Sequence, residues 1–141
     1  MKMKRNYFYL AAGILSVVFA VSHTWHGFET ALSALNNSNM DDSTKTVFTY
    51  IWHIIGVENL VFGVVLIIMA FSKNMEKVKF TALVVIIILI ARWVVITFST
   101  ILNEGINLEL LIDTLGTLAV GALLFFGMRV KSKQADSIHQ S

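Results

Sequence analysis

Three histidines stand where helices would bring imidazole groups together. His23 and His26 are three residues apart, so a helix would place them one turn apart, and His53 lies within the next apolar stretch. Neutral imidazole binds Zn, Cu and haem iron, and facing helices of a four-helix bundle commonly hold cofactors between them. Gly27 and Gly56 would leave room for a flat macrocycle. We therefore interpret His23, His26 and His53 as candidate ligands of haem b or a divalent metal ion.

Two alternatives to this interpretation stay open. In the first, a carboxylate completes a site of three nitrogens and one oxygen for a divalent ion, with Glu29 or Asp113 as its source. In the second, the histidines bind nothing and only form hydrogen bonds across helices or at the headgroups. The His-x-x-His pattern does not distinguish histidines that bind a ligand from histidines that bind nothing, because it is common by chance.

Arg92 and Asp113 are charged residues inside apolar stretches. An ionised side chain at the centre of a bilayer costs about 2.5–3.5 kcal/mol on insertion scales, so Arg92 needs a counter-charge. We predict Asp113 as that partner and Glu58 as the second choice; Glu58 could otherwise lie at a homo-oligomer contact. The pair would either fix the helix register or line a site, where the arginine fork suits a carboxylate, a phosphate or a haem propionate.

Four long apolar stretches must position these residues. Each exceeds the roughly 20 helical residues that cross a hydrocarbon layer about 30 Å thick. The prediction is an all-α, four-helix transmembrane bundle with short loops, forming a single integral membrane domain over 1–141 with a frayed tail at 134–141. A cleaved signal peptide ending at Ser22 is the alternative for the first stretch, which we expect to be retained as a helix. The predicted helices are 7–32, 47–71, 80–102 and 108–128.

Basic residues define the expected topology. Nine of the eleven Lys and Arg residues fall in three tracts that alternate with the apolar stretches. By the positive-inside rule these tracts lie in the cytoplasm, so both termini are inside. The connections at 35–46 and 103–107 are acidic and belong outside, with Asp42 or Ser43 capping the second helix. The three tracts are Lys2, Lys4 and Arg5; Lys73, Lys77 and Lys79; and Arg129, Lys131 and Lys133.

Each helix has a stripe of small or polar residues that we expect to face the bundle interior, because small residues allow close helix packing in membranes. We predict that the four stripes converge on one polar pocket in the outer half of the bundle, centred on His23, His26, His53, Arg92 and Asp113. The stripes are Ala12, Ser16, Ala20, His23 and Gly27; Gly56, Gly63 and Ala70; Thr81, Val85, Ile88, Arg92, Ile96 and Ser99; and Glu109, Asp113, Gly116, Thr117 and Val120.

Composition limits the classes of function. The chain has no cysteine, which excludes thiolate metal sites and disulfides, and its formal charge of +2 suits anionic lipid headgroups better than nucleic acid. No motif of a known enzyme class is present, so catalysis stays undecided. The expected partners are the lipid bilayer and either a second copy or another membrane protein. The chain resembles small bacterial four-pass proteins in hydropathy alone, which points to the cytoplasmic membrane.

Besides binding a metal ion or haem, two other functions fit this pattern. One is a non-catalytic assembly or accessory subunit whose polar residues serve helix packing only. The other is a proton-linked carrier of a small molecule, in which His53, Asp113 and Glu58 would exchange protons; the chain lacks the Gly/Pro-broken helices typical of such carriers. Trp25, Tyr50 and Trp52 are interpreted as an interfacial aromatic belt.

Overall fold

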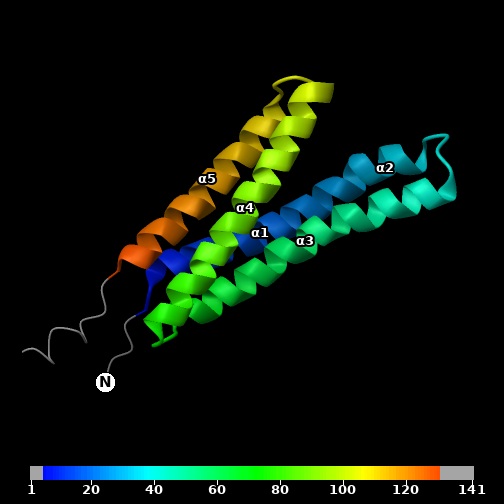
Figure 1. Cartoon of the computed structure of the whole chain (residues 1–141). Coiled ribbons are helices and arrows are strands. Elements are labelled where there is room, and N and C mark those ends of the chain that lie inside the picture. The colour runs from blue at the N-terminus through cyan, green and yellow to red at the C-terminus, as the bar shows by residue number, and fades with distance from the viewer. Residues whose placement is uncertain (1–4, 131–141) are drawn as a thin grey trace, which may run out of the picture.

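The computed structural model describes residues 5–130, which form helices and no strand (Figure 1). Four segments of this region are long and apolar enough to cross a membrane, as the sequence predicts. The predicted fold class, an all-α four-helix transmembrane bundle, is therefore confirmed. The helices are α1 (Tyr7–Glu29), α2 (Ala31–Asn36), α3 (Asp42–Ala70), α4 (Met75–Asn103) and α5 (Leu108–Arg129).

Three helix boundaries differ from the prediction by more than one residue. The first stretch is divided at Thr30, whose hydroxyl donates to the carbonyl of His26 at 2.7 Å, and α2 continues it to Asn36. Helix α3 begins at Asp42 and is capped by Asp41, one residue before the predicted caps. Hydropathy marks only the apolar part of a helix, whereas capped polar turns extend α3 and α4 beyond it. Asn74 caps α4 in the same way.

The helices form two hairpins that diverge like the arms of a V (Figure 1). One hairpin pairs α1 and α2 with α3, and the other pairs α4 with α5. At one end, where α1 and α4 begin and α3 and α5 end, the hairpins lie together; we call this the closed end. At the other, which carries the connections 37–41 and 104–107, they stand apart; we call this the open end.

Small residues let α1 and α3 pack with their backbones in contact. A Cβ on Gly13 would lie 2.8 Å from the carbonyl oxygen of Gly63, and a Cβ on Gly63 would lie 2.9 Å from that of Gly13. Gly56 and Ala70 of the same predicted stripe are also buried. The predicted small-residue stripe of α3 thus faces the bundle interior and packs closely on α1, at Gly13, which the predicted stripe of the first helix did not include.

The closed end holds the centre of the apolar core. Asn6 fixes it, because its backbone N–H donates to the carbonyl of Ala70 at 2.9 Å and its Nδ2 donates to the carbonyl of Gly127 at 2.9 Å. One residue thus joins the start of α1 to the end of α3 through its backbone and to the end of α5 through its side chain. The largest fully buried side chains are Tyr9, Leu66 and Leu124.

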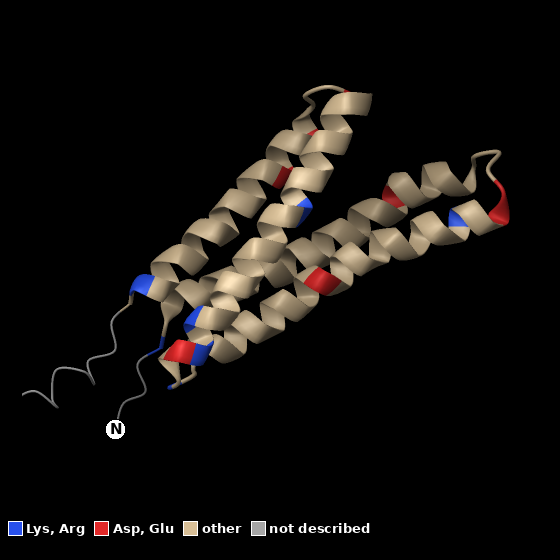
Figure 2. Cartoon of the chain, in the orientation of Figure 1, with Lys and Arg blue, Asp and Glu red and all other residues tan. Residues whose placement is uncertain are grey.

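Charges are segregated along the molecule. Figure 2 shows most basic segments at the closed end, where Glu76 in the first turn of α4 adds an acidic one, and acidic segments at the tips of the open end. Lys2, Lys4, Lys131, Lys133 and the predicted tail at 134–141 lie outside the described residues. Described basic residues next to the closed end are Arg5, Lys73, Lys77, Lys79 and Arg129; the open-end connections and the turns beside them carry Asp41, Asp42 and Glu104 with Lys45.

Candidate functional site

A cavity of about 440 Å³ lies between the two hairpins. All four long helices contribute to its wall, and the whole predicted stripe of α5 takes part. The sequence predicts this convergence for all four helices. The lining includes only Ser16 and His23 of the predicted α1 stripe, only Arg92 and Ile96 of the α4 stripe and none of the α3 stripe. The lining residues are Ser16, Phe19, Ser22, His23 and His26 of α1; Trp52, Ile55 and Asn59 of α3; Leu89, Arg92 and Ile96 of α4; and Glu109, Ile112, Asp113, Gly116, Thr117 and Val120 of α5.

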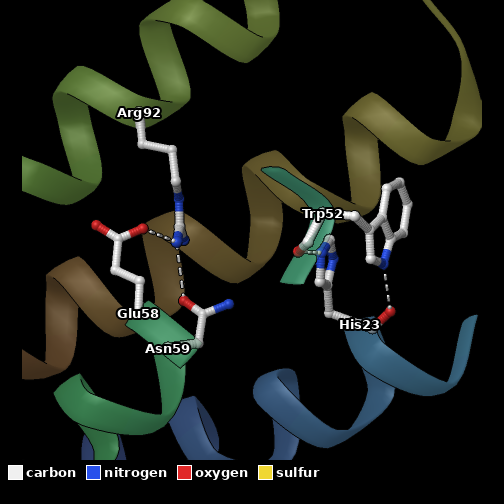
Figure 3. Close-up of polar contacts among 5 residues, drawn as sticks. All are labelled: His23, Trp52, Glu58, Asn59 and Arg92. Atoms are coloured by element: carbon white, nitrogen blue, oxygen red, sulfur yellow. Dashed lines mark hydrogen bonds and ion pairs between the residues drawn. The ribbon is translucent and has the colours of Figure 1, made fainter. Parts of the chain in front are cut away.

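Arg92 connects the two hairpins (Figure 3). Its Nη1 lies 2.9 Å from Glu58 Oε2, an ion pair, and 3.0 Å from Asn59 Oδ1. The prediction of Asp113 as the partner is therefore wrong, and the second choice, Glu58, is the one that the structure forms. Glu58 lies on the side of α3 that faces α4, within reach of the Arg92 guanidinium, and Arg92 itself lines the cavity. The charge of Arg92 is thus compensated inside the protein.

Asp113 projects from α5 into the cavity wall without a counter-charge. Its Oδ2 is buried, and no hydrogen-bond partner reaches this atom from the described residues. The next residue along α5 is satisfied, since Thr114 Oγ1 accepts from Trp93 Nε1 at 2.9 Å and so ties α5 to α4. Burying a carboxylate without a partner is costly. Among the polar groups of this wall, Asp113 would therefore gain the most from a bound ligand or a proton.

His23 is held by Trp52 on the facing helix. The imidazole Nε2 lies 3.2 Å from the Trp52 carbonyl oxygen, and because a carbonyl only accepts, Nε2 carries the proton. Trp52 Nε1 in turn donates to the His23 carbonyl at 3.3 Å, and the two rings stack with centroids 4.4 Å apart (Figure 3). Gly27 makes this possible, because a Cβ there would overlap the indole. His23 thus presents only Nδ1 to a ligand.

The other two predicted histidines lie apart. His26 lines the cavity from an exposed position on α1. His53 does not reach it: its ring lies 5.7 Å from that of Phe28, in a separate pocket between the α1–α2 segment and α3. Trp52 occupies the inward place, and the next residue of a helix points about 100° away. Residues 5–130 hold no group of three His, Asp or Glu side chains placed to bind a metal.

Some lining residues were not predicted from the sequence. Trp52 was assigned to an interfacial belt, but its ring lies in the cavity wall against His23. Gly27 is the sequence signal that could have indicated it, because a glycine on one helix often accommodates a large ring on the next. Phe19 was not singled out either, and nothing in its local sequence distinguishes it from the apolar residues around it.

No protein-family model, curated protein or solved structure matches this chain. The chemistry of the site therefore has to be derived from its own residues. It combines a mainly apolar wall, a compensated arginine, an imidazole with one nitrogen engaged and a half-buried carboxylate whose buried oxygen has no partner among the described residues. Such a wall suits the binding of a small molecule through a few polar contacts.

Proposed function

We propose that this chain is a small four-pass integral membrane protein that binds a small polar ligand in the cavity between its hairpins. The observation that carries this proposal is Asp113 Oδ2, buried in the cavity wall with no partner among the described residues. The volume of about 440 Å³ falls within the range of about 300–1,000 Å³ that is usual for small-molecule sites. His23, His26 and Arg92 complete the polar part of the wall.

A role in helix packing alone accounts for fewer of the polar residues in the cavity wall than a ligand site does. Arg92 with Glu58 and Trp93 with Thr114 are polar groups that join helices and have partners. Tyr9 Oη and Thr97 Oγ1 are also buried without a partner among residues 5–130, but neither residue lines the cavity, whereas Asp113 does. Asp113 sits between these satisfied groups and has no such partner among residues 5–130. An intramembrane ionisable residue that faces a cavity in this way is typical of a ligand or ion pathway.

The open end is proposed to face the outside of the cell. Basic residues concentrate at the closed end and acidic residues at the tips of the open end (Figure 2), which agrees with a cytoplasmic closed end under the positive-inside rule. The ligand would then enter from the outer side, and a bacterial cytoplasmic membrane is the proposed location. A carrier that couples this ligand to protons would use the same Asp113 carboxylate.

Metal or haem binding is a second proposal with less support. It would rest on His23 Nδ1 and His26, because His23 Nε2 is bound to the Trp52 carbonyl and His53 lies in another pocket. An absorbance spectrum and a metal analysis of the purified protein would test it directly. A stoichiometric chromophore or metal that disappears in His23→Ala would support ligation; its absence from protein purified with added haem or Zn²⁺ would contradict it.

Ligand-dependent stability tests the main proposal. The full chain in lipid nanodiscs would be unfolded thermally with millimolar ammonium compounds, carboxylates, phosphate esters, sugars or Zn²⁺. A ligand at about 100 times its Kd stabilises the folded state by about 2.7 kcal/mol, so the transition temperature should rise for one class. Asp113→Asn should abolish that rise, whereas Glu104→Gln, a matched change in the open-end connection, should keep it. Equal shifts in wild type and Asp113→Asn for every compound would contradict the proposal.

A further inference from the structure

We infer that the ligand is an organic cation, an ammonium group on an aromatic or aliphatic body, with its charge at Asp113. This inference rests on the proposed function and adds to it the chemical class of the ligand. Three features of the cavity lead to it: the balance of charge in the wall, the apolar surface beside the carboxylate and the scarcity of ligands for a bare metal ion.

The wall of the cavity has an excess of negative charge. Asp113 and Glu109 are four residues apart on α5, so both carboxylates lie on the same face of the helix, one turn apart. Arg92 is the arginine of this wall, and Glu58 already compensates it at 2.9 Å. The polar hydrogen of His23 points to the Trp52 carbonyl. The wall therefore carries two carboxylates, an arginine that is already paired and, as its other basic groups, the imidazoles of His23 and His26. A cation would be attracted to it more than an anion.

Apolar surface lies directly beside the carboxylate. Phe19 of α1 packs against Gly116, since a Cβ on that glycine would lie 3.0 Å from the Phe19 Cζ atom. Gly116 is less than one helical turn from Asp113, so the aromatic ring and the carboxylate lie close together on the wall. An aromatic face next to a carboxylate is a recognised arrangement for organic ammonium groups. Leu89, Ile112 and Val120 continue the apolar wall around the ring and would cover the body of the ligand.

A bare divalent cation fits this wall poorly. Ca²⁺ takes six to eight oxygen ligands and Mg²⁺ an octahedron of about six, whereas the carboxylates here come from two positions of one helix. No group of three metal-binding side chains occurs in the described part of the chain. A volume of about 440 Å³ also exceeds by far what one ion needs, but it accommodates an organic molecule.

Charged thiol reagents can measure this selectivity, because the native chain has no cysteine. Thr117→Cys and Ser22→Cys would each place one thiol in the cavity wall, from α5 and α1, and Met40→Cys would place one in the exposed connection as the control. The full chain in nanodiscs would react with a trimethylammonium-ethyl or a sulfonatoethyl methanethiosulfonate. We expect the cationic-to-anionic rate ratio at both cavity positions to exceed the control ratio about tenfold. Adding Asp113→Asn should lower this rate ratio at the cavity positions towards the ratio measured for Met40→Cys.

Protection experiments with matched ligands test the aromatic body. Benzylammonium, benzyl alcohol and benzoate differ in the charge on a similar frame, and each would compete with uncharged N-ethylmaleimide for Thr117→Cys and Ser22→Cys. Benzylammonium at about twice its Kd or above should slow the reaction at least about threefold through Asp113, and the other two should not. The protection should be absent when Asp113→Asn is present.

The outcomes separate this inference from the function on which it rests. Equal rate ratios at the cavity and control positions, or protection by benzoate or benzyl alcohol as good as by benzylammonium, would overturn the cationic ligand but leave a polar ligand site. Lack of protection by all three compounds would also overturn it. If neither cavity thiol reacted with any reagent while Met40→Cys did, water would not reach the cavity, and the proposed function would fail as well.

Discussion

The closed end and the open end of this molecule are built from the same four helices and yet pack in opposite ways. At the closed end, Asn6 joins three helix ends and Tyr9 is fully buried against Gly127. At the open end, the hairpins part around a cavity and Arg92 bridges them by contacts to Glu58 and Asn59. We therefore expect the closed end to supply most of the stability and the open end to carry the proposed ligand site.

The side chains at each end explain this difference. Glycine and alanine at the closed end let helix backbones touch, which is the main source of packing in lipid, where burying apolar surface brings little gain. At the open end, large rings such as Phe19 and Trp52 and charged groups such as Arg92 stand between the hairpins. Helix α3 is consequently packed far more closely on α1 than on α4. Changes at the closed end should therefore act on stability, and changes at the open end on hairpin separation and binding.

The largest expected effect comes from filling the closed end. In Gly127→Leu, the new Cβ would lie 2.7 Å from Tyr9 Cε1, and the buried tyrosine ring has no room to move. Overpacking of this kind costs about 3 kcal/mol at the upper end of its usual range, so the free energy of unfolding should fall by about that amount. Unfolding in mixed micelles with increasing fractions of dodecyl sulfate would measure it.

Gly121→Leu is the matched control for that change, because it lies on the same helix and a Cβ there meets nothing within 4 Å. It should alter stability by no more than about 0.5 kcal/mol, and leucine is the better helix former. A loss as large as that of Gly127→Leu would contradict the assignment of stability to the closed end.

A smaller effect is expected from the bridge at the open end. Arg92→Gln and Glu58→Gln each leave one charge without its partner, whereas the double variant leaves none, so a double-mutant cycle should give a coupling energy of about 1 kcal/mol. Spin labels on Tyr50→Cys and Leu102→Cys should report a wider distance distribution between the hairpins in either single variant.

Arg129→Gln is the control for the bridge, because it makes the same change at the closed end, where the guanidinium stacks on Phe125 at 4.3 Å. It should leave the distances between the spin labels unchanged. A coupling energy near zero, together with unchanged distances in Arg92→Gln, would mean that the bridge does not hold the hairpins.

The smallest effect is a pH dependence at the tip of the open end. Hydrogen bonds from Thr44 lower the pKa of Asp41 below its ordinary value of 3.8. A carboxyl with a lowered pKa stabilises the folded state fully above the ordinary value and loses this contribution as the pH falls through the lowered value. Hydrogen exchange of the Thr44 amide, corrected for its intrinsic rate, should therefore accelerate only at acidic pH. Asp41→Asn should remove this pH dependence, and exchange at the start of α4, capped by Asn74, should not show it.

Much of the fold could be predicted from the sequence because hydropathy and periodicity are local properties. Four apolar stretches define four helices, and the seven-residue spacing of Gly56, Gly63 and Ala70 predicted a packing face on α3. That this face packs on α1, through Gly13, was not predicted. The helix ends were missed by a few residues where capped polar turns prolong a helix past its apolar part. Asp41 rather than Asp42 or Ser43 caps α3 for this reason.

The site was predicted in part. Rotation around α5 placed Asp113, Gly116 and Thr117 on one face, and all of them line the cavity. The partner of Arg92 was missed, because the choice between Asp113 and Glu58 depends on which neighbour α4 leans towards. His53 was expected beside His23, but the structure places Trp52 there, one residue and about 100° away.

The sequence by itself determined that this chain has four membrane-spanning helices and which face of each carries small or polar residues, because both follow from the order of residues along one helix. Only the tertiary structure decided that the hairpins diverge, that Arg92 pairs with Glu58 and that Asp113 is left in the cavity wall without a described partner. The physical reason is that pairing depends on the distance and rotation between helices. The distance and rotation between the helices depend on packing at closed-end residues such as Asn6 and Gly127, which lie far from the cavity.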